Sequence, residues 1–259
     1  GDSPLELMNN PFLKYDGTKY IHFTFSEKMA TIIFTLGKYL QLLLFPHPLT
    51  HDYYPRHVEL MSFSDISVII SLLAYISLLV FGIRLSLKKN IIGYCILFYL
   101  ITLSIVSNIV FPIGTNMSER FLFMPSVGFC LLLAYLLSKI SKNTAYLIVG
   151  IVVIGFGYKT ITRNMAWKDN FTLFTTDINV SKNSAKLNNA VGGDMIRVYN
   201  ESKDENLKKQ KLTEAIGYLK RAVEIHPIYK NAYLLMGNAY YYLKDYAKSV
   251  EAYQNALKI

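Results

Sequence analysis

Residues 90–118 read NIIGYCILFYLITLSIVSNIVFPIGTNMS, which is a run of 29 residues without a charged side chain. A helix that crosses a bilayer needs about 20 mostly apolar residues, so this stretch is long enough for a tilted span. Charged residues bound three further apolar runs, at residues 66–83, 121–138 and 144–158. We therefore expect the first part of the chain to form a bundle of membrane helices.

A fifth run, residues 29–45, is weaker because Gly37, Lys38 and Gln41 lie in its middle. A charged side chain deep in a bilayer is costly, so this run either crosses the membrane or lies in its interface. The sequence thus predicts four or five spans.

Composition agrees with a membrane protein. Hydrophobic residues make up 52% of the 259 residues and charged residues 17%, whereas soluble domains carry about 25% charged residues. This excludes a disordered chain. Cys95 and Cys130 both lie in apolar runs, which is typical of small buried hydrophobes. The net charge of +9 fits cytoplasmic loops and lipid headgroups, so we expect no nucleic-acid partner.

Lys and Arg in the short loops predict the orientation. Arg84, Lys88 and Lys89 follow the run at residues 66–83, and Lys139 and Lys142 precede the last run. Because cytoplasmic loops are enriched in Lys and Arg, both loops are expected in the cytoplasm. The last span then carries the C-terminal part to the extracytoplasmic side. We expect an integral, multi-pass protein of a bacterial inner membrane or of the endoplasmic reticulum.

The C-terminal part repeats with a period of 34 residues. The matching pairs are Ala215 with Ser249, Leu219 with Tyr253, and Ala222 with Ala256. This period, with small residues where helices cross, is typical of tetratricopeptide repeats. A charged insert at about residues 200–211 is expected as a solvated loop. The chain begins with Gly and ends at Ile259 before the Pro that closes such a unit, so we interpret it as an internal fragment.

The predicted fold class is all-α, with a polytopic membrane helix bundle followed by a tetratricopeptide-repeat α-solenoid. Four parts are expected. They are a membrane-proximal loop (1–27), a transmembrane bundle (28–158), a connecting segment (159–185) and about two repeats, the last truncated (186–259).

A polar loop beside the membrane is the first candidate site. Residues 46–57 read PHPLTHDYYPRH, and function concentrates in such loops. We expect them to line a pocket for a phosphate-bearing headgroup, with Asp52 or a His as acid or base. A divalent metal held by His47, His51 and Asp52 is an alternative, although their spacing is irregular. An interfacial loop with aromatic anchors is another. The expected pocket-lining residues are His47, His51, Asp52, Tyr53 and Arg56.

Glu119 and Arg120 form the second candidate site, between two apolar runs. Charged groups at a membrane boundary usually face the bundle interior or a water-filled cavity. The guanidinium of Arg120 suits phosphate oxygens, and Glu119 is expected to orient it or to act as a base. The alternative is a short outer turn whose charges mark the membrane edge.

Several of these segments resemble a known family. They are NPF at residues 10–12, YLQLLLFP at 39–46, FPIG at 111–114, ERFLFMPSVGF at 119–129 and WKDN at 167–170. In this order they resemble the transmembrane and tetratricopeptide-repeat (TMTC) O-mannosyltransferases. The block at residues 119–129 is the most specific.

The resemblance implies a polytopic glycosyltransferase of the GT-C type. Such enzymes transfer a sugar from a polyprenyl-phosphate carrier to an acceptor protein or glycan on the outer side of the membrane. In the eukaryotic family the donor is dolichyl-phosphate mannose and the acceptor is a Ser or Thr hydroxyl. The family's catalytic acidic residue belongs to the first outer loop, which nothing here matches, so no catalytic residue is assigned. The loop HPLTHDYY at residues 47–54 differs from the corresponding loop of the animal members. This difference suggests that the chain resembles a bacterial relative of the family.

The function expected is therefore a membrane hexosyltransferase for a mannose-like sugar. Arg120 and Glu119 would bind the donor phosphate, and the repeats would bind the acceptor or protein partners. The alternative is a non-enzymatic, membrane-anchored repeat scaffold for envelope assembly. A scaffold needs only one span, however, and no charged pair at the boundary. A transporter would use inverted repeats, and the sequence shows no such pairing.

Overall fold

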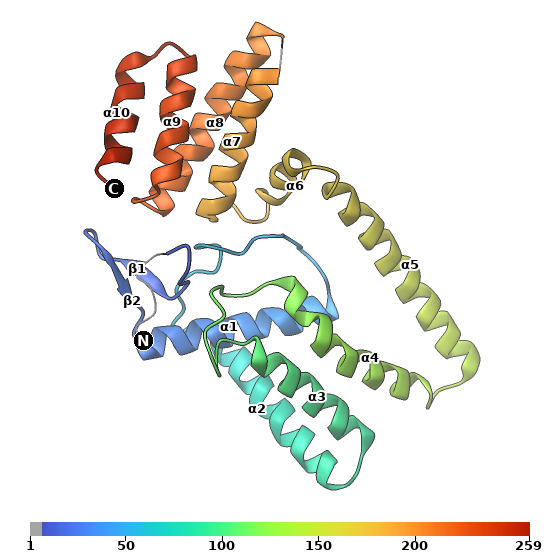
Figure 1. The fold of residues 1–259 in the computed structure, drawn as a ribbon. Helices are drawn as coiled ribbons and strands as arrows, with labels where there is room; N and C mark the ends of the chain where they lie inside the picture. The colour runs from blue at the N-terminus through green and yellow to red at the C-terminus, as the bar shows by residue number, and fades with distance from the viewer. Residues whose placement is uncertain (1–6, 202) are drawn as a thin grey trace. The chain divides into compact units, whose positions relative to one another are not determined.

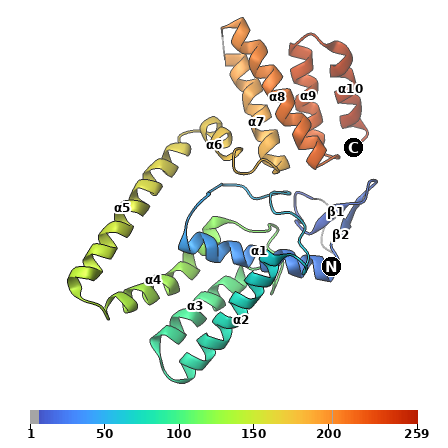
Figure 2. The same cartoon turned by 180° about the vertical axis from the view of Figure 1, so that it is seen from behind.

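The computed structural model describes residues 7–201 and 203–259. Within these ranges it has ten α-helices, one short 3-10 helix and a two-stranded hairpin (Figures 1 and 2). The chain divides into two compact units. The membrane unit holds residues up to His51 together with residues 58–165, and the repeat unit holds residues 52–57 together with residues 166–259. The all-α prediction is confirmed.

The membrane unit begins with a hairpin of β1 (Leu13–Tyr15) and β2 (Tyr20–His22), which leads into α1 (Phe25–Leu44). Thr24 starts α1 with a capping box, in which its hydroxyl accepts from the Glu27 N–H and the Glu27 carboxylate accepts from the Thr24 N–H. The expected loop at residues 1–27 therefore carries a hairpin, and its first six residues lie outside the described part.

Three helical segments are long and apolar enough to cross a membrane. They are α2 (Ile66–Leu87), the 3-10 helix η1 (Glu119–Leu122) continued by α4 (Phe123–Leu137), and α5 (Lys142–Ala166). The apolar helix α3 (Ile91–Ile105) is shorter, at 15 residues. The expected span at residues 90–118 is therefore helical only in its first half.

Asn108 explains why α3 ends early. Its backbone has a φ of 62°, and its side chain closes an irregular loop. The amide nitrogen donates to the carbonyls of Thr115 and Asn116, while the amide oxygen accepts from the Ile113 N–H. Pro112 also lacks the N–H that a continued helix needs. The uncharged run thus contains a 15-residue apolar helix followed by an irregular loop.

Helix α1 is not among the three candidate spans, and it crosses the α2–α3 pair at a steep angle (Figures 1 and 2). Gly37 lies at the contact with α2, where a Cβ would collide with the Ser71 side chain. The Tyr75 hydroxyl of α2 donates to the Leu36 carbonyl at 2.9 Å. Gly37 therefore serves close helix packing.

Small residues also bring α2, α3 and α4 together. A Cβ on Gly93 would collide with the backbone of α2 at Ser86, and one on Gly128 would collide with the Cys95 carbonyl of α3. Cys95 is buried as expected, but Cys130 is exposed, because it lies on the other face of α4 from Gly128. Both cysteines are free thiols.

The repeat unit holds the remaining helices. They are α6 (Asn170–Asp177), α7 (Ala185–Glu201), α8 (Glu205–Ile225), α9 (Lys230–Tyr242) and α10 (Tyr246–Leu257). Helices α7 and α8 pair, as do α9 and α10 (Figure 1). Gly192 receives the Leu219 side chain and Gly237 receives the Tyr253 ring, which is the helix crossing that the repeat pattern predicts.

The charged insert differs from the prediction. Helix α8 begins at Glu205, so most of residues 200–211 is helical. Asp204 caps this helix by accepting from the N–H groups of Asn206 and Leu207. Lys208 then pairs with Glu205 at 2.7 Å, one turn apart. Local capping and charge pairing thus extend α8 outward.

Candidate functional site

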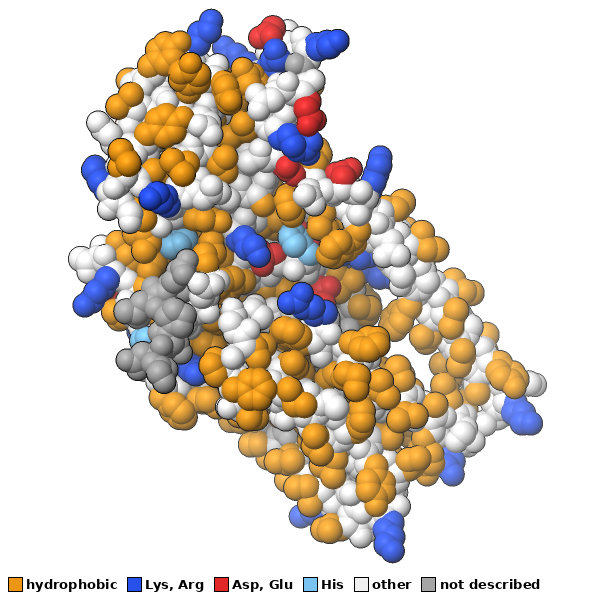
Figure 3. Space-filling model, in the orientation of Figure 1, with side chains coloured by type: hydrophobic (Ala, Val, Ile, Leu, Met, Phe, Trp, Pro, Cys, Tyr) orange, Lys and Arg blue, Asp and Glu red, His pale blue; other side chains and the backbone are white. Residues whose placement is uncertain are grey.

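A cavity of about 500 Å³ opens in the membrane unit where four segments meet. The segments are the end of α1, the loop that follows it, the η1–α4 junction and the last turns of α5. Hydrophobic side chains cover much of the visible face of this unit (Figure 3). The charged lining residues are Glu119, Arg120, Lys159 and Arg163, and the large apolar ones include Leu42, Leu122, Phe123 and Phe156.

Hydrogen bonds to the backbone fix the place of Glu119 and Arg120. The Ser118 N–H donates to the buried Tyr39 hydroxyl at 3.0 Å, which anchors the start of η1 to α1. The Glu119 carboxylate accepts from the Thr50 N–H at 2.7 Å. Glu119 therefore holds the loop after α1 against η1. The next side chain, Arg120, is exposed at the cavity with its guanidinium 5.4 Å from the Phe121 ring centroid.

Lys159 and Arg163 bring two further cations, from the last turns of α5. They are four residues apart and so share one helix face. The Lys159 ammonium lies 3.0 Å from Nδ1 of His47. An ammonium can only donate, so Nδ1 of His47 is the acceptor in this contact. Both cations fall in the segment at residues 159–185 that the sequence predicts as a connection, and neither is a predicted site residue. Their signal is a pair of cations at a spacing of four where an apolar helix ends.

The lining is amphiphilic. Three cations and one carboxylate leave two positive charges in excess, and Leu42, Leu122 and Phe156 form apolar parts of the same wall. Concentrated cations beside apolar walls raise the local concentration of anions, and guanidinium groups fork onto phosphate oxygens. The arrangement therefore suits a ligand with an anionic head and an apolar tail.

Known proteins are similar to this sequence. A tetratricopeptide repeat family model matches residues 231–259. Protein O-mannosyl-transferase Tmtc3 of Drosophila melanogaster is 31% identical over 244 residues, which cover 89% of this chain and 25% of that protein. Human TMTC3 is 33% identical over 58% of this chain and 16% of its own length, and human TMTC1 is 25% identical over 79% and 24%. The chain is homologous to the TMTC protein O-mannosyl-transferases. It spans about a quarter or less of the length of these relatives.

The TMTC resemblance is thus confirmed, and so is the repeat. The three relatives are animal proteins, and the bacterial origin stays a prediction. Together with the three candidate spans, the homology indicates a multi-pass membrane protein.

The predicted pocket-lining residues fall into two groups. His47 and His51 belong to the membrane unit, whereas Asp52, Tyr53 and Arg56 belong to the repeat unit. His47 reaches the cavity through Lys159. The other four are not among the described residues that line this cavity, and their part in substrate binding stays a prediction.

Asp52 instead has a clear structural environment in the repeat unit. It is buried, and its carboxylate accepts from the Tyr54 N–H at 3.1 Å and from the Ser184 hydroxyl at 3.3 Å. Ser184 also donates to the Tyr54 carbonyl at 2.8 Å, and its hydroxyl accepts from the Leu187 N–H in the first turn of α7. Residues 52–57 therefore form a strap that packs on the start of α7.

Two residues of the repeat unit have shifted pKa values, mainly through burial. Burial, with a smaller contribution from the Arg56 cation, lowers the pKa of His226 to about 4. Burial, with a smaller contribution from the Asp52 carboxylate, raises the pKa of Tyr229 to about 12. Both side chains are therefore neutral at neutral pH, which suits their contact with each other, with ring centroids 5.1 Å apart.

The sequence offers His47, His51 and Asp52 as alternative ligands of a divalent metal. Across residues 7–201 and 203–259 the structure gathers no group of three or more His, Cys, Asp or Glu side chains that could hold a metal ion. The divalent metal stays an untested alternative for the whole protein.

Proposed function

We propose that this TMTC homologue is part of a membrane glycosyltransferase. It transfers a mannose-like sugar from a polyprenyl-phosphate carrier to the hydroxyl of an acceptor protein or glycan on the extracytoplasmic side. The observation that carries the proposal is the 500 Å³ cavity, whose lining joins three cations to apolar side chains where membrane helices end.

Each part of the donor has a matching part of the lining. Arg120, Lys159 and Arg163 bind the phosphate, and apolar side chains such as Phe156 contact the first prenyl units. In the transfer, the bond between the sugar C1 and the phosphate oxygen breaks while a bond forms from C1 to the acceptor oxygen. The leaving phosphate gains negative charge, which the placed cations stabilise. The acceptor proton passes to a base.

Glu119 acts here as a positioning residue. Its carboxylate accepts from the Thr50 N–H, so it holds the loop that carries the lining residues Pro46 and Leu49. This role explains why a site that binds an anion contains a carboxylate, because the Glu119 carboxylate accepts a hydrogen bond from the backbone.

The extracytoplasmic side is supported by the course of the chain. Helix α4 leads away from the cavity to a turn with Lys139 and Lys142, and α5 returns to the cavity at Lys159. Turns rich in Lys face the cytoplasm, so the cavity lies at the opposite membrane face. The repeats, which follow α5, would then offer their surface to acceptors and protein partners on that same side.

The test is sugar transfer from dolichyl-phosphate mannose to an acceptor in membranes that contain the full-length protein. Arg120→Ala is expected to lower the rate by about a hundredfold, the scale of losing one preorganised charge partner of the transition state. The matched control is Lys139→Ala, which removes a cation at the other end of α4. The proposal fails if Arg120→Ala transfers sugar at the rate of the unmodified protein.

A further inference from the structure

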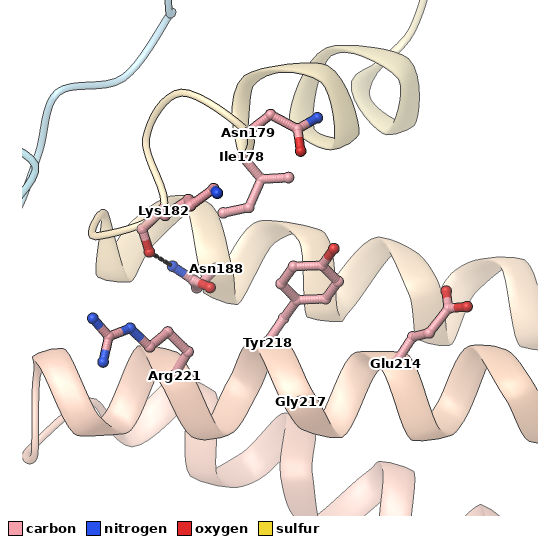
Figure 4. A pocket seen from close by; sticks show the side chains of 8 residues that line it. All are labelled: Ile178, Asn179, Lys182, Asn188, Glu214, Gly217, Tyr218 and Arg221. Atoms are coloured by element: carbon pink, nitrogen blue, oxygen red, sulfur yellow. Dashed lines mark hydrogen bonds between the residues drawn. The ribbon is translucent and has the colours of Figure 1, made fainter.

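The repeat unit has a second cavity, of about 430 Å³, which the proposed transfer does not use. It lies between the α6–α7 turn and one face of α8 (Figure 4). Glu214, Gly217, Tyr218 and Arg221 form a single stripe of α8, because residues three and four apart share a helix face. The opposite wall consists of Ile178, Asn179, Lys182 and Asn188.

Gly217 forms the floor of this groove, and packing does not require it. Gly192 and Gly237 each receive a neighbouring side chain, whereas a Cβ on Gly217 would meet nothing within 4 Å. Glycine in a helix interior is less stable than alanine. The floor of the groove at Gly217 is therefore open on the surface of α8.

Opposite charges mark the two ends of the groove. Arg221 and Lys182 lie at one end, Glu214 at the other, and the Tyr218 ring with Ile178 between them (Figure 4). Arg221 follows Glu214 by seven positions of the helix, which is a rise of about 10 Å along the helix axis.

Neighbouring side chains hold both charged groups in place. Arg221 donates to the Asn183 amide oxygen at 2.8 Å and to the Glu224 carboxylate at 3.0 Å. The Glu214 carboxylate accepts from Lys211 and Gln210. The two ends of the groove are thus oriented before a ligand arrives, which reduces the ordering cost of binding.

We propose that this groove binds an extended polypeptide segment of mixed charge. A segment in the extended polyproline II conformation rises about 3.1 Å per residue with three residues per turn, so an acidic side chain at the Arg221 end and a basic one three residues away at the Glu214 end face the same side. The side chain between them lies over Gly217 and packs on the Tyr218 ring. Charge at both ends favours such a segment over a neutral sugar. The proposal does not depend on sugar transfer.

The test measures binding of a fluorescent Gly-Ser peptide that carries Asp-Leu-Ser-Lys, with the full chain in lipid nanodiscs. Gly217→Trp fills the floor and is expected to weaken binding by about tenfold or more, whereas Gly217→Ala binds nearly as the unmodified chain does. Arg221→Glu also weakens binding, and a peptide with Lys in place of Asp restores it. The control is Lys209→Glu, an equal charge reversal at an exposed site of α8 outside the groove.

Three results would overturn the proposal. The first is unchanged binding by Gly217→Trp. The second is an equal loss in Lys209→Glu and Arg221→Glu, which would mean that only net charge matters. The third is full competition by free mannose together with loss of mannose binding in Gly217→Trp, which would assign the groove to a sugar.

Discussion

Ser184 is the residue whose removal should most directly loosen the strap from the rest of the repeat unit. It is fully buried, and its hydroxyl joins the two strap residues Asp52 and Tyr54 to the first turn of α7 at Leu187. The change Ser184→Ala removes all of these bonds while adding no volume.

The magnitude follows from the bonds lost. Loss of a side chain that caps a helix N-terminus costs about 1 kcal/mol. Removing one partner of a buried hydrogen bond costs about 1–3 kcal/mol, which here applies to the bond from the Ser184 hydroxyl to the Tyr54 carbonyl. The repeat unit is therefore expected to lose about 2–4 kcal/mol of its free energy of unfolding.

Hydrogen exchange measures this loss in the purified chain. The amides of α7 are expected to exchange about thirty- to a thousandfold faster, which is the same free energy expressed as an opening equilibrium. Thr213→Ala is the control, because this exposed hydroxyl of α8 donates only to the Lys209 carbonyl. It should change stability by less than about 0.5 kcal/mol. Equal protection of α7 in both variants would refute the role given to Ser184.

Three further outcomes are expected. His226 has a pKa of about 4 when folded and about 6.5 when unfolded, so the unfolded chain binds more protons between these pH values. The free energy of unfolding of the repeat unit should therefore fall by up to about 3 kcal/mol as the pH falls from 7 to 4. His226→Gln should flatten this dependence in denaturation curves. Gly237→Leu should unfold the α9–α10 pair in circular dichroism at lower temperature than Gly217→Leu, because only the first collides with a ring, that of Tyr253. Asn108→Ala should lower sugar transfer without loss of helix content, because it releases the loop that leads to Arg120; unchanged transfer would separate that loop from the site.

Local patterns explain what the sequence predicts correctly. The apolar runs mark α2, α4 and α5 because a spanning helix needs only length and composition. The 34-residue period marks the equivalent helices α8 and α10 because each needs a small residue where it crosses its partner helix, as at the buried Ala215 and Ser249.

Contacts between residues far apart in the chain explain the features that the sequence does not predict. Lys159 joins the site because the end of α5 lies beside η1 in the folded structure. Residue spacing in the sequence does not predict this contact. The strap at residues 52–57 packs against Ser184, about 130 positions later. The end of α3 depends on the side-chain hydrogen bonds of Asn108. A mean hydropathy over many residues does not predict such bonds.

Photo-labelling with a prenyl phosphate that carries a diazirine near its phosphate tests the central claim most directly, because it locates the lipid head on the chain. The account predicts labels at η1, the start of α4 and the last turns of α5, and their loss in a protein with both Arg120→Ala and Lys159→Ala. Labels confined to other segments, or unchanged by these two substitutions, would contradict it.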